Sequence, residues 1–278
     1  DDALRLNSQG KLNLMFPTQK TLEKLTEFSD VEEALNYVRN APPATPMEPR
    51  LTVGAGGKKL LVPGDFAYAE AGKLDPEQLG TVSREIEAGV LVQIDKRVWR
   101  MTAANASIMT GPGTNTYILG DDLNGYLVID PGPDNARHIE LVRDLTSDKV
   151  NGILCTHTHI DHSPGAAPLS RLTGAPIFGR LAENMDRQDS SFVPDEELSD
   201  GDELKFGDLT IDVLHTPGHA SNHLCFLFEE ARMLFTGDHI MQGSTVVINP
   251  PDGDMSAYFS SLNKLYDYQF DWIAPGHG

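Results

Sequence analysis

The spacing of hydrophobic and polar positions differs between two parts of the chain, and it changes near residue 90. Before it, apolar residues recur at helical spacing in residues 17–28 and 30–41, which predicts two amphipathic helices. Asp30 precedes Glu33 by three positions, which is the spacing of an N-terminal cap for the second of these helices. The start of the chain is therefore predicted to be helical.

Between these helices and residue 90 the pattern predicts shorter elements separated by a proline-rich segment. Residues 41–49 contain four prolines and predict an extended linker. Residues 51–69 fit a short hairpin, and residues 75–87 fit another helix. We therefore expect residues 1–88 to form a small N-terminal helical appendage.

After residue 90 the dominant pattern is a succession of short apolar runs bounded by Gly and Asp. These runs predict strands, and two longer runs with helical spacing, 136–145 and 255–267, predict helices. The predicted strands are 91–103, 114–119, 126–132, 150–156, 203–208, 209–216, 223–230 and 232–238. Strands outnumber helices, and helices separate some of them. This pattern predicts an α/β fold of layered sheets with helices outside, in a second domain over residues 89–278.

Composition narrows the class of protein. The 278 residues carry a formal net charge of −19, which opposes non-specific binding to nucleic acid. No apolar run approaches the roughly 18 residues that a membrane span needs. The two cysteines, Cys155 and Cys225, have neither metal-site nor disulfide spacing, so a reducing cytoplasm is the expected location.

One stretch concentrates metal-binding side chains. The sequence THTHIDH, at the end of the apolar run 150–156, contains His157, His159, Asp161 and His162. In an extended loop the first three share a side, and His162 points elsewhere, where it can serve a second ion. Ser163 and Pro164 follow, with the residue types of an N-cap and a first helical residue.

Three further candidates lie where other predicted strands end. His219 stands in HTPGHA, Asp238 in FTGDHI and His277 in APGHG. Asp130, in VIDPG, has the same placement, as a loop organiser or as an acceptor behind a ligand. Because strand ends at one edge of a sheet converge on one cleft, we expect these side chains to meet the THTHIDH loop there.

The donor set indicates a catalytic metal site. Imidazole and carboxylate suit Zn²⁺, and also Mn²⁺ or Fe²⁺, and no cysteine is needed. Five histidines and two aspartates would supply three ligands that bind only one ion, for each of two ions, and one carboxylate that bridges both. Two such ions can share and deprotonate a water, giving a bridging hydroxide. The neighbouring His215, His223 and His239 are expected to pack behind the ligands, and His138 to lie on the surface.

The ordered motifs THTHIDH, HTPGHA, LFTGD and PGHG resemble the metallo-β-lactamase superfamily over residues 90–278. The resemblance implies a four-layer αβ/βα sandwich. It also implies a set of ligands divided between two zinc ions. That set is His157, His159 and His219 on one ion, Asp161, His162 and His277 on the other, and Asp238 as the bridge.

The resemblance narrows the reaction without naming the substrate. Asp238 disfavours β-lactam hydrolysis, because true β-lactamases of the superfamily generally lack this aspartate. HTPGHASNH is similar to glyoxalase II, although its glutathione-binding residues are absent. MTGPGTNTYILG, GDHIMQGSTVV and YFSSLNKL are similar to the lactamase-β-like branch, which includes an endoribonuclease and in which the chain continues past the last histidine. LNLMFPTQKTLEKL resembles, more weakly, the tail of a Nudix hydrolase.

The expected function is therefore a dinuclear-metal hydrolase acting on a small ester or thioester. Asp161 and Asp238 are the candidate catalytic carboxylates, and Asn115, Ser244 and Thr245 the candidate substrate contacts. RNA or phosphodiester cleavage is the first alternative, and a di-iron redox protein the second. No membrane partner is expected, and the N-terminal appendage is the candidate surface for a homo-oligomer.

Overall fold

The computed structural model describes residues 2–42, 46–184 and 187–278, which form two compact units divided between Glu48 and Pro49. The first unit contains α1 (Asp2–Ser8), α2 (Phe16–Leu25) and α3 (Val31–Asn40). The Asp30 carboxylate accepts a hydrogen bond from Glu33 N at 2.9 Å, which confirms the predicted cap. In the predicted linker 41–49, residues 43–45 lie outside the described part of the chain.

The second unit begins with the expected hairpin, β1 (Arg50–Thr52) paired antiparallel with β2 (Lys59–Leu61). The helix predicted at 75–87 is wrong: the helix of this region is α4 (Tyr68–Leu74), and a loop follows it. The Asp75 carboxylate accepts hydrogen bonds from three backbone N–H groups of that loop, at Leu79, Gly80 and Thr81. A side chain that binds the backbone in this way favours a loop over a helix.

Residues 49–88 belong to the same compact unit as the sheets, although the predicted boundary fell after residue 88. Two ion pairs join α4 to the neighbouring strands. Arg100 binds Glu70 at 2.6 Å, and Lys73 binds Asp95 at 2.5 Å. As a structural division, the boundary lies 40 residues earlier than the sequence pattern suggested.

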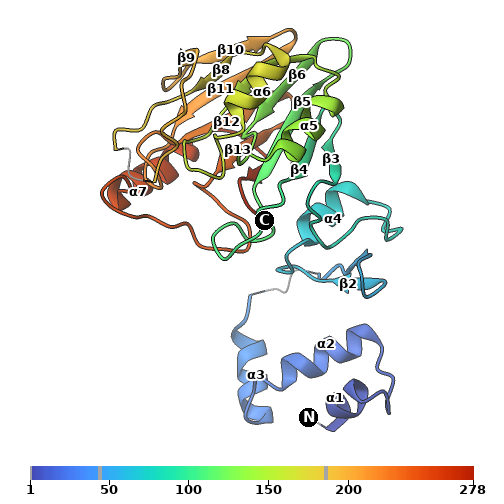
Figure 1. Cartoon of the computed structure of the whole chain (residues 1–278). Helices are drawn as coiled ribbons and strands as arrows, with labels where there is room; N and C mark the ends of the chain where they lie inside the picture. Colours follow the sequence, from blue (N-terminus) through green and yellow to red (C-terminus); the bar gives the residue numbers. More distant parts are fainter. Residues whose placement is uncertain (1, 43–45, 185–186) are drawn as a thin grey trace. The chain divides into compact units, whose positions relative to one another are not determined.

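Two sheets make the body of the second unit (Figure 1). The larger has the strand order β3-β4-β5-β6-β7-β8-β9 and the smaller β10-β11-β12-β13-β14. The predicted strand 91–103 is a hairpin of two strands. The bounds in the larger sheet are β3 (Leu91–Asp95), β4 (Val98–Thr102), β5 (Asn115–Asp121), β6 (Gly125–Ile129), β7 (Val150–Leu154), β8 (Ile177–Gly179) and β9 (Glu196–Glu197). Those in the smaller are β10 (Glu203–Phe206), β11 (Leu209–His215), β12 (Leu224–Phe228), β13 (Met233–Gly237) and β14 (Trp272–Pro275).

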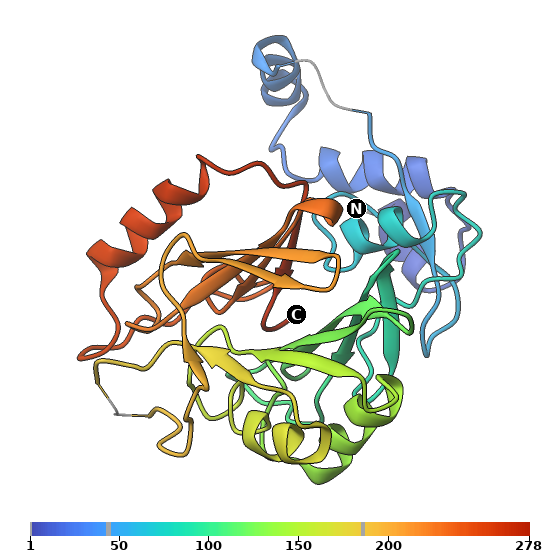
Figure 2. The ribbon, with the colours of Figure 1, turned by 90° about the horizontal axis from the view of Figure 1, so that it is seen from above.

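Helices cover the outer face of each sheet, so the layers run helix, sheet, sheet, helix (Figure 2). Helices α5 (Ala136–Leu145) and α6 (Ala166–Thr173) lie on the larger sheet, and α7 (Met255–Leu265) lies on the smaller. A short 3₁₀ turn, η1 (Glu229–Ala231), joins β12 to β13. The expected four-layer αβ/βα sandwich is confirmed.

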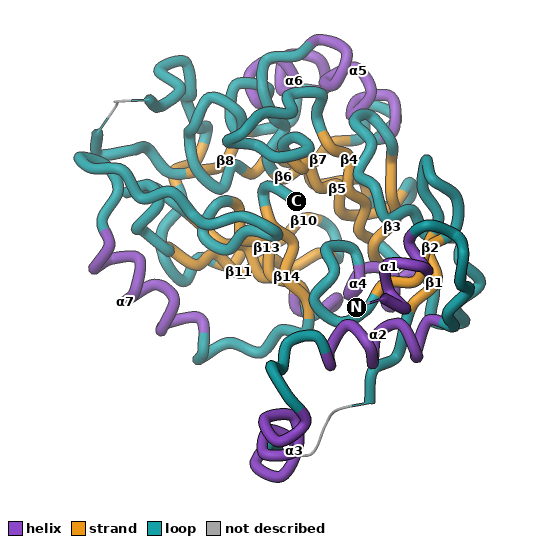
Figure 3. Tube along the Cα trace, turned by 90° about the horizontal axis from the view of Figure 1, so that it is seen from below, coloured by secondary structure: helices purple, strands orange, loops and turns teal. Residues whose placement is uncertain are grey.

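Three apolar clusters fill the spaces between these layers. Leu127, Phe226 and Phe235 belong to the cluster between the sheets. Ile139 of α5 belongs to the cluster on one outer face, and Leu265 of α7 to that on the other. Long loops gather at one edge of the sheets, where the chain ends (Figure 3). Within the described residues, no helix has the length and apolarity needed to cross a membrane.

Candidate metal centre

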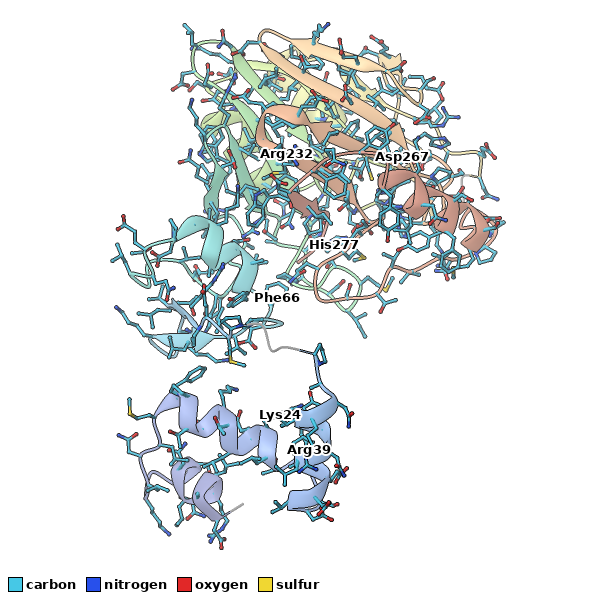
Figure 4. All side chains as sticks on the ribbon, turned by 180° about the vertical axis from the view of Figure 1, so that it is seen from behind. Lys24, Arg39, Phe66, Arg232, Asp267 and His277 are labelled. Atoms are coloured by element: carbon cyan, nitrogen blue, oxygen red, sulfur yellow. The ribbon has the colours of Figure 1, made fainter. Side chains whose placement is uncertain are left out.

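Each predicted ligand lies in a loop that follows a strand at this edge of the sandwich. His157 follows β7, His219 follows β11, Asp238 follows β13, and His277 follows β14. Figure 4 labels His277 at this edge, well away from Asp267 beside α7. The sheets therefore bring together side chains that lie up to 120 positions apart in the sequence.

The first group consists of three imidazoles. His159 Nδ1 lies 2.9 Å from His157 Nε2 and 2.9 Å from His219 Nε2. The ring nitrogens of the three thus converge on one point, as the ligands of one cation do. These are the three residues predicted to share the first ion.

The second group combines two imidazoles with a carboxylate. His277 Nε2 lies 3.3 Å from His162 Nε2 and 3.2 Å from Asp161 Oδ2. Their ligand atoms also fall within the reach of a single cation. This set is the one predicted for the second ion.

Asp238 lies between the two groups. Its Oδ1 is 3.3 Å from His162 Nε2, and its Oδ2 is 3.5 Å from His219 Nε2. Oδ1 is buried and finds no hydrogen-bond donor among the described residues. A buried carboxylate oxygen without a donor is costly unless a cation approaches it.

Hydrogen bonds on the far side of three rings fix where their lone pairs point. His162 Nδ1 lies 2.9 Å from the Asp130 carboxylate. His219 Nδ1 lies 2.6 Å from the carbonyl oxygen of Val247, and His277 Nδ1 lies 3.2 Å from that of Gly113. These oxygens can only accept, so each Nδ1 carries the proton, and in the neutral ring Nε2 offers a lone pair to the cluster. Lone pairs that face each other at about 3 Å need a cation between them, and the residues fit a divalent metal ion.

The electrostatics of the cluster agree with that need. Burial alone would lower the pKa of His277, but the carboxylates of Asp161 and Asp238, 3.2 and 3.4 Å from its Nε2, raise it to about 9. Burial would raise the pKa of Asp161, but the charge of His162 and the hydrogen bond from His277 lower it to about 2. The carboxylates thus stabilise positive charge on their neighbours, and protons and metal ions compete for the same nitrogens.

The loop that carries THTHIDH continues differently from the prediction. Helix α6 begins at Ala166 with Gly165 as its N-cap, not at Ser163 and Pro164. The Ser163 hydroxyl donates to the Asp189 carboxylate at 2.9 Å, and it is the backbone oxygen of Ser163 that accepts from Ala166 N. Residues 160–165 instead form turns, in which His162 N donates to His159 O.

A cleft of about 530 Å³ opens above the cluster. His159, Asp161, His219, Asp238 and His277 contribute to its floor. Its walls come from the 107–110 loop, the exposed Ile160, Arg187 and the segment 241–252. A volume of this size suits a small-molecule ligand. Sequence reasoning missed Arg187 and the 107–110 loop, because single loop residues carry no periodic signal.

The predicted substrate contacts divide in two. Ser244 and Thr245 line the cleft. Asn115 does not: it is fully buried, and its side-chain amide donates to the carbonyl oxygens of Pro275 and Gly278 at 3.1 Å each. Both contacts flank His277, so Asn115 holds the loop of a predicted ligand.

The other histidines lie behind the cluster. His223 Nε2 accepts a hydrogen bond from Asp238 N at 3.2 Å, and His215 Nε2 donates to Ser221 O at 2.9 Å. His239 packs against Tyr258 with ring centroids 4.9 Å apart. His138, expected on the surface, is buried in α5 with Nε2 2.8 Å from Thr116 Oγ1.

The family model of the metallo-beta-lactamase superfamily matches residues 109–277. That range contains both triads, Asp238 and the whole cleft floor. It covers more than half of the chain, and it begins after the first strands of the larger sheet.

Two curated relatives are named as a lactamase-like protein and as a thioesterase. The lactamase-like protein aptB of Emericella nidulans is 33% identical over 68% of this chain and 59% of its own length. An atrochrysone carboxyl ACP thioesterase of Aspergillus fumigatus is 32% identical over 73% of this chain and 62% of its own length. The chain thus spans about three fifths of the length of these relatives.

Solved structures share the fold. A metallo-beta-lactamase from Pontibacter korlensis has a TM-score of 0.58 at 18% identity, covering 68% of this chain and 91% of its own. TTHA1623, solved in a di-iron-bound form, has a TM-score of 0.53 at 27% identity, covering 64% of this chain and 91% of its own.

Proposed function

The chain belongs to the metallo-beta-lactamase superfamily and is a metal-dependent hydrolase, and we propose that it cleaves a small thioester or ester at a dinuclear centre. In this proposal His157, His159 and His219 hold one ion, and Asp161, His162 and His277 hold the other. Asp238 bridges them. Zn²⁺ is the proposed metal, with Fe²⁺ or Mn²⁺ as alternatives.

The observation that carries the proposal is the position of Asp238 between two converging triads. Its Oδ1 is buried without a donor, while its carboxylate faces ring nitrogens of both groups. A site for one ion would leave one triad and one of these oxygens uncompensated. When bound, two divalent ions supply Lewis acidity and activate water near neutral pH.

The chain's own residues would orient and polarise this centre. Asp130 orients His162, and the Val247 carbonyl orients His219, so both rings present Nε2 to the cluster. Asp161 remains about one quarter exposed at the cleft floor, where it can accept a proton from water. The cleft above would hold the acyl part of the substrate.

A thioester is preferred within this class for two reasons. One of the relatives is named as a thioesterase acting on a carrier-protein-bound acyl group. The cleft itself has a largely apolar wall, formed by Ile108, Met109 and Ile160 among others. An apolar wall suits an acyl group better than it suits a sugar-phosphate chain.

RNA cleavage finds no support in the charges. The chain carries a formal net charge of −19, and Arg187 is the one Lys or Arg among the described residues that line the cleft. Single-stranded nucleic acid is bound by grooves lined with several cations. The redox alternative rests on the di-iron form of TTHA1623, and metal analysis decides it.

The test begins with elemental analysis of the purified protein. A panel of thioester, ester, lactone and RNA substrates is then assayed with the matched metal. We expect about two ions per chain and thioester hydrolysis that falls at least 100-fold in Asp238→Asn. The matched control is Asp267→Asn, an exposed carboxylate beside α7 that should leave the rate unchanged (Figure 4). One ion per chain in an active enzyme would contradict the dinuclear proposal.

Three expectations stay predictions. They are a cytoplasmic location, a homo-oligomer formed through the N-terminal residues, and residues 1–88 as an appendage to the catalytic domain. Light scattering of the whole chain measures the second of these directly.

A further inference from the structure

Arg187 is an unpaired cation at the rim of a mostly apolar cleft. Its side chain is exposed, and no ion pair or hydrogen bond engages it within the described part of the chain. The other charged residues that line the cleft are Asp161, Asp238 and Asp252. The first two belong to the candidate metal centre, and Asp252 accepts hydrogen bonds from Gln188 and Ser221, so Arg187 is the one Lys or Arg side chain among the described lining residues that can face a ligand.

The backbone holds Arg187 in this position. Its φ is +64°, in the left-handed region that residues other than Gly and Asn rarely occupy. The next residue, Gln188, is buried and fixed by two hydrogen bonds. Its amide donates to Asp252 Oδ2 at 2.9 Å, and its carbonyl accepts from Thr158 Oγ1 at 2.6 Å.

These bonds connect the rim to the floor of the cleft. Thr158 lies between His157 and His159, and Gln188 forms a β-bridge with His159. Asp252 also accepts from the Ser221 hydroxyl at 2.6 Å, two residues beyond His219. The segment that carries Arg187 is therefore tied to two loops of the candidate metal centre.

Apolar side chains form the rest of the rim. Ile108 is fully exposed, and Met109 and Ile160 are more than half exposed. Large apolar side chains that gather at a cleft in this way mark a ligand-binding surface. Arg187 stands beside them as the one Lys or Arg among the described residues that line the cleft.

We propose that Arg187 binds a carboxylate carried by the acyl group of the substrate, whose apolar body lies against Ile108, Met109 and Ile160. This inference rests on the proposed thioesterase function and names its substrate class. A planar guanidinium matches a carboxylate through two parallel hydrogen bonds, and a single arginine suffices for that contact. In a chain of charge −19 such a local cation is needed, because the overall field repels an anionic substrate.

The test uses three thioesters and four forms of the full chain loaded with metal. The probes are the N-acetylcysteamine thioesters of naphthoic acid and of a naphthalene dicarboxylic acid, and the coenzyme A thioester of naphthoic acid. The enzymes are the unmodified chain, Arg187→Ala, Arg187→Lys and Arg171→Ala. Arg171 is an exposed arginine on α6 outside the cleft, and it serves as the matched control.

We expect Arg187→Ala to raise KM for the dicarboxylic probe about tenfold and to leave its kcat within about twofold. In Arg187→Ala, KM for the neutral probe should change less than about twofold. For the dicarboxylic probe, KM of Arg187→Lys should lie between those of Arg187→Ala and the unmodified chain. KM of Arg171→Ala should equal that of the unmodified chain. A fifth form, Ile108→Ser, assayed in addition with an acetyl thioester, should raise KM for both N-acetylcysteamine naphthyl probes relative to that thioester, because it removes apolar contact.

The outcomes separate the two proposals. If the unmodified chain hydrolyses no thioester, the proposed function fails. If it hydrolyses the neutral probe but Arg187→Ala affects both N-acetylcysteamine probes equally, the function stands and the carboxylate contact is overturned. A loss confined to the coenzyme A probe also overturns it, because the anion would then lie on the leaving group.

Discussion

The carboxylate of Asp130 lies 2.9 Å from His162 Nδ1, on the side of the ring that faces away from the metal centre. The same carboxylate accepts hydrogen bonds from Thr156 N and Thr156 Oγ1, both at 2.7 Å. Asp130 has a φ of +50° and is buried, so its position is costly in free energy and well defined. All three of these hydrogen bonds serve the loop THTHIDH.

Asp130→Asn should therefore weaken metal binding without removing a ligand. The amide group would place a donor against the Thr156 hydroxyl or the His162 N–H, and the ring would lose its orientation. We expect metal affinity to fall about 10- to 100-fold, measured by competition with a chelator. Asp208→Asn, at an exposed carboxylate on the far loop between β10 and β11, is the control. Equal affinities in the two variants would contradict the orienting role.

Gly276 allows the close approach of two candidate ligands. A Cβ at this position would lie 2.7 Å from Asp238 Oδ1 and 2.7 Å from His162 Cε1. Gly276→Ala should displace these groups and reduce hydrolysis by at least about 100-fold while the sandwich stays folded, because sub-ångström misplacement is costly to catalysis. Steady-state kinetics and circular dichroism measure the two effects. Gly56→Ala, where the nearest atom would be 3.4 Å away, should retain the activity.

The clustering of the candidate ligands could be predicted from the sequence because their positions follow a local rule. Each comes directly after an apolar strand, and strand ends at one edge of a sheet converge. The same rule placed Asp130 at this edge, although the pattern could not tell a ligand from the residue that orients one. That distinction depends on which side of His162 the carboxylate faces, which only the packed structure determines.

The wrong predictions came from side-chain hydrogen bonds that the pattern of hydrophobic and polar positions does not contain. Asp75 binds three backbone N–H groups and turns a helical pattern into a loop. Ser163 resembles an N-cap but donates to Asp189, which is 26 residues away. Asn115 was predicted to contact substrate, yet it opens β5 and its amide is satisfied by the chain around His277. For Ser163 and Asn115 the partner lies outside the side chain's own segment, and for Asp75 it lies within the predicted helix.

The ion pair between Arg100 and Glu70 should contribute more to stability than an exposed pair. The Arg100 side chain is 7% exposed and binds Glu70 through two hydrogen bonds of 2.6 and 3.1 Å. Glu70→Ala would leave a buried guanidinium unpaired and should cost about 3 kcal/mol in the free energy of unfolding. Arg232 and Asp271 form the matched exposed pair, labelled at Arg232 in Figure 4. Asp271→Ala should cost less than about 1 kcal/mol in the same denaturant titration.

Burial of His138 should make the fold sensitive to acid. Burial lowers the pKa of His138 from its ordinary 6.5 to about 4, so the unfolded chain binds a proton in this range and the folded chain does not. The neutral ring therefore contributes its full stability above pH 6.5, and that contribution is lost as the pH falls towards 4. The difference of about 2.5 pKa units corresponds to at most about 3 kcal/mol.

His138→Gln isolates this contribution, because its amide can still donate to Thr116 Oγ1 but does not titrate. As the pH falls from 6.5 to 4, we expect the unfolding free energy of the variant to rise progressively relative to that of the unmodified chain. Denaturant titrations at several pH values measure this difference, with the metal content held equal. Leu141→Met, on the same helix and without a titrating group, should show the same dependence of unfolding free energy on pH as the unmodified chain. If His138→Gln also shows the same pH dependence as the unmodified chain, His138 does not titrate differently in the folded and unfolded chains.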